Sequence, residues 1–187
     1  MKNKPFYLVL FLALLLAGDL ASGQDSLGAK PKKARTPEDY KLRTLKEIAA
    51  VGADLVRERG GDIEGDGKGH AATLVHGDLL PSRVRVIYKG SARPLTRNKK
   101  DVISQWARRY AGNPDHYTVP YASEVLFTED GVDHWLVVKA TFLPEFKREL
   151  KRGRAVDLYL IRLGAFKTRG KWRWVLLVET FATPKRT

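Results

Sequence analysis

The last third of the chain carries a strand pattern that restricts how the protein can fold. Both faces of the segment 172–181 are apolar, with Trp172, Trp174, Leu176 and Val178 on one face and Val175, Leu177 and Phe181 on the other. The segment 156–163 has the same character. A strand that is apolar on both faces has to be covered on both sides. We therefore expect one face to pack on helices and the other to line a concave interior or an interface.

Periodicity and turn signals place the other elements of this domain. A helix is predicted to begin at Thr36-Pro37, which provide an N-cap and a first-turn proline, and a second helix spans 98–110. The predicted strands are 72–76, 84–88, 117–127, 132–142, 156–163 and 172–181, with turns at 77–78, 129–131 and 168–171 and a short helix at 143–153. The pattern predicts an α+β domain: a curved antiparallel sheet of four to six strands, the last four forming a meander, with amphipathic helices on one face.

Two resemblances refine this prediction. The order of the elements and the closing segment Gly170-Lys171-Trp172-Arg173-Trp174-Val175-Leu176-Leu177 resemble the nuclear-transport-factor-2-like superfamily, which includes the SnoaL-like bacterial proteins. That resemblance implies a cone-shaped roll. It also implies either an enzyme or a non-catalytic ligand-binding protein, and it transfers no catalytic residue. The segment 150–159 is similar to the helix-then-strand entry of small barrels, so an SH3-like or OB-like barrel is the alternative fold.

The N-terminus resembles a secretory signal. Lys2 and Lys4 precede an apolar run from Phe6 to Ala17, and the small residues 21–23 follow at the distance of a cleavage site. The run is too short to span a bilayer. We expect a signal peptide at 1–23, a disordered basic linker at 24–36 and a single domain at 37–183. The mature protein is then secreted or periplasmic, without a transmembrane segment.

Charge suggests the kind of partner. The chain has 34 Lys and Arg against 21 Asp and Glu, and the segment 83–100 contains no acidic residue. The candidate anion-binding residues in that segment are Arg83, Arg85, Lys89, Arg93, Arg97, Lys99 and Lys100. A second basic run occupies 147–154. If the two converge, they form a site for an anionic ligand or an envelope polymer. The alternative is a solvated basic surface that favours solubility.

Catalytic and metal chemistry have weaker signals. The chain has no Cys, which excludes thiolate metal sites and a cysteine nucleophile. The acidic loop 62–67 resembles the first half of a calcium loop, but Thr73 stands where the motif needs Glu, so we predict no metal and no cofactor. A pocket in the curved sheet would be lined by polar strand residues, and the candidates are Tyr121, Glu124, His134, Tyr159 and Glu179.

Three functions remain open at this level. The first is a secreted, non-catalytic protein that binds an anionic or small apolar ligand in the cell envelope. The second is a cofactor-independent SnoaL-like enzyme with a single acid/base residue in the pocket. The third is an interaction module that forms a homodimer through its sheet face, which requires an exposed apolar surface.

Overall fold

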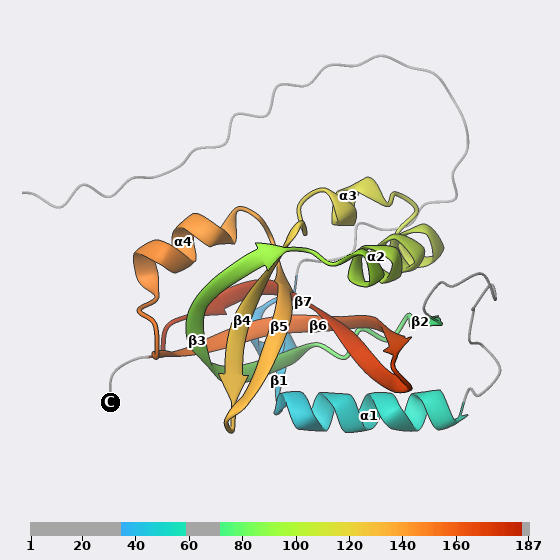
Figure 1. Ribbon diagram of the computed structural model, residues 1–187, viewed down its shortest axis with the longest axis horizontal. Coiled ribbons are helices and arrows are strands. Elements are labelled where there is room, and N and C mark those ends of the chain that lie inside the picture. Colours follow the sequence, from blue (N-terminus) through green and yellow to red (C-terminus); the bar gives the residue numbers. More distant parts are fainter. Residues whose placement is uncertain (1–34, 59–71, 185–187) are drawn as a thin grey trace, which may run out of the picture. The chain divides into compact units, whose positions relative to one another are not determined.

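The computed structural model describes residues 35–58 and 72–184. These residues form an α+β domain with a mixed seven-stranded sheet (Figure 1). The elements are a 3₁₀ turn η1 (Pro37–Asp39), β1 (Lys41–Leu42), α1 (Leu45–Glu58), β2 (Thr73–Val75), β3 (Ser82–Pro94), α2 (Arg97–Tyr110), α3 (Asp115–Thr118), β4 (Ser123–Glu129), β5 (Val132–Val138), α4 (Phe142–Glu149), β6 (Ala155–Thr168) and β7 (Lys171–Ala182). The predicted signal peptide and most of the predicted linker lie outside the described residues.

Five of the strands close on themselves. The first half of β3 pairs with β6, from Ser82↔Leu160 to Ile87↔Ala155. Its second half pairs with β4, and the register shifts around Gly90, which has a φ of 78°. The pairings therefore run β3–β4–β5–β7–β6 and return to β3. The short strands β1 and β2 add to β3 and β6.

The inside of this ring is a hydrophobic core. All five strands contribute, with examples in Val84, Phe127, Leu136, Leu158 and Leu176. Helix α4 adds Phe146 from one side, and α1 adds Leu45 and Ile48. Closing the ring puts one sheet face inside, where apolar side chains replace water.

A second core covers the outer face of β6 and β7. Helix α2 packs its apolar stripe, Val102, Ile103 and Trp106, against outward-facing residues such as Ile161 and Leu177. The Trp106 indole N–H donates to the carbonyl of His76 over 3.0 Å. The expectation that β6 and β7 are covered on both sides is thus confirmed, because one face lines the barrel interior and the other lies under α2.

Two parts of the predicted architecture are wrong. The last four strands are not an antiparallel meander, because β5 pairs with β7 in parallel through Val137↔Leu177 and Val138↔Val178. Helix α4 separates β5 from β6, and β6 then pairs with β3 and β7 instead of with β5. The helices also do not share one face, since α1 and α4 contact the interior core while α2 covers the outside.

The first helix begins later than predicted. Thr36 and Pro37 start only the turn η1, in which the Thr36 amide donates to the Asp39 carboxylate over 2.7 Å. Helix α1 begins after Thr44, whose hydroxyl accepts from the amide of Glu47 while the Glu47 carboxylate accepts from the amide of Thr44. Thr44 and Glu47 thus form a reciprocal capping box at the start of α1.

Strand ends also differ from the prediction. Residues 115–118 form helix α3, so β4 begins only at Ser123, and Phe142 belongs to α4 instead of β5. Phe181 lies with the interior core, opposite to its predicted face, because an extra residue in β7 between Val178 and Thr180 shifts the alternation. The turns at 129–131 and 168–171 are confirmed as two-residue hairpins. Among the described residues, no helix has the length and apolar character needed to cross a membrane.

Candidate anion-binding surface

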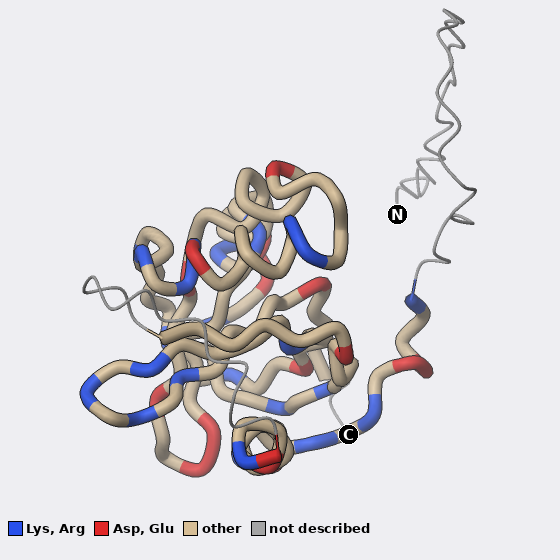
Figure 2. The backbone as a smooth tube through the Cα atoms, turned by 90° about the vertical axis from the view of Figure 1, so that its right-hand side faces the viewer, with Lys and Arg blue, Asp and Glu red and all other residues tan. Residues whose placement is uncertain are grey.

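The β6–β7 hairpin carries the most concentrated exposed charge among the described strands. Its turn residues Arg169 and Gly170 both have positive φ, 49° and 76°, as a tight two-residue hairpin requires. Four basic side chains occupy alternate positions around the turn and are exposed: Lys167, Arg169, Lys171 and Arg173. Figure 2 shows where Lys and Arg lie along the backbone of the described residues. We call these four residues the hairpin cations.

The hairpin cations have no acidic neighbours in sequence, and none of them forms an ion pair with an acid of the described residues. The chain contains no Asp or Glu between Asp157 and Glu179. The half-buried indole of Trp172 stands directly opposite Lys167 in the ladder. Cations that lack protein counter-ions attract external anions, and an adjacent aromatic ring can stack on a planar group.

Among the predicted basic residues of 83–100, Arg93 and Lys99 converge on one carboxylate. Glu124 is fully buried on β4, and its two oxygens contact the Arg93 guanidinium at 2.7 Å and the Lys99 ammonium. Lys99 also donates to the carbonyl of Trp135 over 2.6 Å. Burial lowers the pKa of Lys99, while the neighbouring Glu124 carboxylate works in the opposite direction. Lys99 is therefore buried with its counter-ion, whereas Arg93 is held by the same carboxylate but keeps a partly exposed side chain.

Arg85 is also neutralised inside the protein. Its guanidinium donates twice to Asp157, over 2.7 and 3.0 Å, in the two-pronged geometry that Arg and carboxylate favour. The pairing Arg85↔Asp157 between β3 and β6 brings the two side chains together. Sequence reasoning missed this pair, because Asp157 lies 72 residues away in the chain.

The other predicted basic residues are dispersed. Arg83 is half-buried on β3, whereas Arg97 and Lys100 are exposed on the first turn of α2. Lys89 lies at the bend of β3, where Gly90 approaches the side chain of Arg152. The first basic segment and the 147–154 run therefore meet at this bend. Helix α4 leads into the start of β6 and the hairpin turn is at its far end, so this basic region and the hairpin cations lie at opposite ends of the barrel (Figure 1).

Three of the predicted pocket residues do meet, but outside the barrel. Tyr40 donates to Glu179 over 2.5 Å and packs edge-on against Tyr159, with ring centroids 5.3 Å apart. Arg35 donates to both oxygens of the same carboxylate over 2.9 Å. Burial raises the pKa of Tyr121, and the negative charge of Glu179 adds to that effect. The Glu179 carboxylate thus already accepts hydrogen bonds from the Arg35 guanidinium and the Tyr40 hydroxyl.

The remaining two pocket candidates lie elsewhere. Glu124 belongs to the buried cluster with Lys99, and His134 lies on β5 near the β4–β5 turn. Burial lowers the pKa of His134, against the opposing effect of Glu129 and Asp133. The five predicted residues therefore do not line a common pocket.

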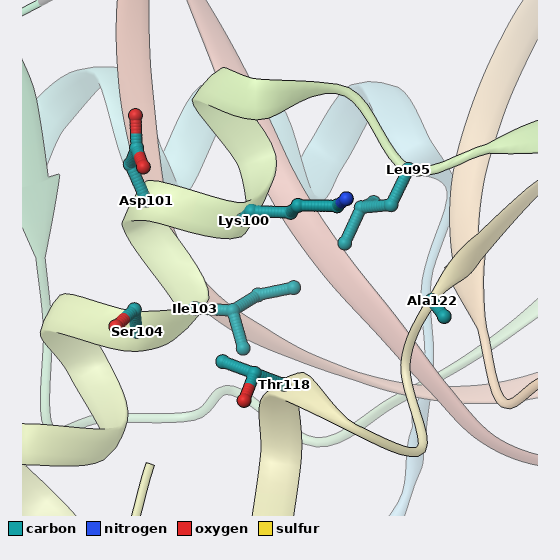
Figure 3. Close-up of a pocket in the computed structure, with 7 residues that line it drawn as sticks. All are labelled: Leu95, Lys100, Asp101, Ile103, Ser104, Thr118 and Ala122. Atoms are coloured by element: carbon teal, nitrogen blue, oxygen red, sulfur yellow. The ribbon is translucent and has the colours of Figure 1, made fainter. Parts of the chain in front are cut away.

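A shallow groove of about 340 Å³ lies beside α2 (Figure 3). Leu95, Ile103 and Ala122 form apolar walls, and Lys100, Asp101, Ser104 and Thr118 supply polar groups. Figure 3 shows the Lys100 side chain extending toward Leu95, while Asp101 points away from it. The groove offers a single ammonium group to a small ligand. The described residues include no group of three or more metal-ligating side chains, and the acidic loop 62–67 lies outside them.

Comparisons with known proteins add no family. No family model, no curated protein and no solved structure matches this chain. Functional inference therefore rests on the geometry of the barrel and its charged surfaces.

Proposed function

We propose that this domain is an OB-like barrel that binds a single-stranded polyanion without catalysis. Two features support the OB-like assignment over the nuclear-transport-factor-2-like roll. The ring of strands is closed by the β3–β6 pairing, and its third and fifth strands, β5 and β7, are parallel. Helix α4 connects the third strand to the fourth and plugs the barrel with Phe146.

The OB-like assignment proposes where the ligand binds. OB folds bind oligonucleotides and oligosaccharides on the outer face of their second and third strands, flanked by the loops between strands 1 and 2 and strands 4 and 5. In this chain those strands are β4 and β5, and the loop between strands 4 and 5 is the turn of the β6–β7 hairpin. The hairpin cations therefore occupy one flank of the proposed binding face.

The observation that carries the proposal is the composition of this hairpin. Four exposed cations without described acidic partners stand around one turn, interleaved with Trp172. Basic side chains gain free energy by replacing counter-ions along a polyanion, and an indole adds stacking on rings. Single-stranded nucleic acid and acidic glycans both fit such a surface. Each carries regularly spaced negative groups, and these alternate with bases or sugar rings.

The face of β5 adds a second aromatic group. The Arg93 guanidinium lies 4.0 Å from the centroid of the half-buried Trp135 ring, and the Arg93 side chain is 42% exposed. The Arg93 guanidinium also forms an ion pair with Glu124, and this contact fixes the position of the Arg93 side chain. This Arg–Trp pair provides a partly exposed cation and aromatic ring on the proposed face.

The alternatives gain less support. The barrel interior is occupied by buried apolar side chains, which argues against a small apolar ligand there. Glu124 and Glu179, the two carboxylates suited to acid/base chemistry, are both held by cations. The exposed large hydrophobic residues are spread over several elements, among them Leu42, Val119 and Val132, and do not outline a sheet face for dimerisation. The predicted export signal places the proposed binding in the cell envelope or outside the cell.

The test is equilibrium binding of the full chain to a labelled thymidine oligonucleotide at low salt. A variant that replaces Lys167, Arg169, Lys171 and Arg173 by Gln should lose binding. A control variant that replaces the exposed Lys147, Lys151, Arg152 and Arg154 by Gln removes the same charge from the opposite end and should bind almost normally. Competition by an unlabelled sulfated glycan and by anionic vesicles identifies which polyanion is preferred. Equal loss in both variants would contradict the hairpin as the site.

A further inference from the structure

Arg162 is a cation buried inside the barrel, and none of the described acidic side chains forms an ion pair with it. It stands in the middle of β6 and has no exposed surface. Its ladder partner is Leu176, an interior core residue, so the Arg162 side chain shares that interior face. Fully buried arginines are rare unless they are paired.

Among the described residues, the guanidinium of Arg162 has no hydrogen-bond acceptor. Its three nitrogen atoms, Nε, Nη1 and Nη2, are all buried and unsatisfied. Its identified neighbour is the ring of Trp174, whose centroid lies 5.5 Å from Cζ. Leaving a buried polar group without a partner is costly, and much more so for a charge. The planar guanidinium has five N–H donors, which suit the two oxygens of a carboxylate or phosphate group. Here the described residues supply no such oxygens to it.

Burial is the largest electrostatic cost of the Arg162 charge, and its two charged neighbours, Asp78 and Arg43, act in opposite directions. Burial lowers the pKa of Arg162, and the nearby Arg43 lowers it further, while Asp78 opposes the change. Asp78 is close enough to influence the charge but makes no described hydrogen bond with it. An anion bound at the guanidinium would offset both the loss of hydration and the repulsion from Arg43.

We propose that Arg162 anchors an internal site for a small oxyanion, either a phosphate or a carboxylate group. The site lies at the α1 end of the barrel, because Trp174 contacts both Arg162 and Gly52 of α1. After Gly52, α1 contains no buried residue, so displacing this half of the helix loses few contacts and admits the anion. This site is separate from the hairpin cations and does not depend on them.

The test measures thermal unfolding of the full chain in millimolar phosphate or acetate, with chloride added to keep the ionic strength constant. Each tenfold increase in a bound anion above its Kd should raise the Tm of the wild type by about 3–5 °C. Arg162→Met should lose this increase and, without added anion, should be at least as stable as the wild type, because it removes an uncompensated buried charge. The hairpin variant with four Gln substitutions should keep the increase.

Three results decide the proposal. A Tm increase with phosphate alone, or with acetate alone, that disappears in Arg162→Met identifies the class of oxyanion. The same increase in wild type and Arg162→Met, or no increase in either, overturns the proposal. If Arg162→Met does not fold, tryptophan emission of the wild type during a phosphate and an acetate titration replaces it. The emission should change through Trp174, the change should be absent in Trp174→Phe, and an unchanged wild-type emission would overturn the site.

Discussion

The indole of Trp174 on β7 lies against the backbone of Gly52 on α1. A Cβ atom built at position 52 would approach three atoms of that ring to less than 3.0 Å. The contact joins α1 to the barrel, and glycine at this helical position leaves room for the ring. It also places the helix next to the residue that packs on Arg162.

This contact reverses the usual effect of alanine in a helix. Gly→Ala in a helix interior normally stabilises by about 1 kcal/mol. In Gly52→Ala we expect the clash with Trp174 to outweigh this gain, so that the free energy of unfolding falls by about 1–2 kcal/mol. Urea denaturation measures the change. The matched control is Gly52→Ala in a Trp174→Ala background, where the clash is gone and the substitution should stabilise. A loss of equal size in both backgrounds would contradict the contact.

Gly164 tolerates a larger side chain even less than Gly52 does, because the atom that lies against it belongs to the backbone. A Cβ at this position would lie less than 3.0 Å from the carbonyl oxygen of Leu74, in the pairing of β2 with β6. Gly164→Ala should therefore destabilise by about 1–3 kcal/mol or more. Gly170→Ala is the control, since it has open space but a φ of 76°, and should cost about 1 kcal/mol through backbone strain. Thermal unfolding of both variants compares the two effects, and an equal or smaller loss in Gly164→Ala would contradict the close approach.

The buried cluster around Glu124 should be sensitive to the loss of its charge. Glu124→Gln keeps the shape of the side chain but leaves the buried Lys99 without its carboxylate, and we expect a loss of about 3–5 kcal/mol. The double substitution Glu124→Gln with Lys99→Met removes both charges and should recover much of that loss. Chemical denaturation of Glu124→Gln, Lys99→Met and the double variant gives the free energy of coupling between the two residues. Additive effects would show that the two residues do not act as a pair.

Alkaline pH should destabilise the protein through its buried phenols. Burial raises the pKa of Tyr40, and its hydrogen bond to Glu179 raises it further. A pKa that is higher in the folded state means that the unfolded chain loses the proton first. This contribution to stability is complete below pH 10, the ordinary tyrosine pKa, and is lost as the pH rises above it. Unfolding measured at several alkaline pH values should show a smaller decline in Tyr40→Phe, and an identical decline would contradict the effect.

Elements that depend on neighbouring residues were predictable from the sequence, whereas pairings between distant strands were not. The helix at 98–110 and the turns at 129–131 and 168–171 follow from periodicity and turn residues that lie next to one another. The parallel contact between β5 and β7 has no local signal, because it depends on where α4 directs the chain. For the same reason the sequence indicated an array of free cations at 83–100, whereas the carboxylates of Glu124 and Asp157 pair with three of them across strands.

The site residues show the same limit. Tyr121, Tyr159 and Glu179 were predicted to face a pocket, and their positions do approach one another, but Tyr40 from the N-terminal segment occupies the carboxylate. Arg162 did have a signal, because it is one of only two charged residues, with Asp157, in the otherwise apolar run 156–163, but strand alternation alone could not distinguish it from a residue at an edge. Only the closed ring shows that its side chain faces the interior.

The salt dependence of polyanion binding tests the central claim most directly. Binding of a thymidine oligonucleotide is measured between 50 and 200 mM salt for the wild type, the hairpin variant and the control variant at 147–154. If four hairpin cations neutralise four phosphates, log K should fall with log salt at a slope of about −2.8, an affinity loss of about 50-fold over this range. The control should keep this slope, and the hairpin variant should lose it. A wild-type affinity that does not change with salt, or a slope that survives in the hairpin variant, would contradict the account.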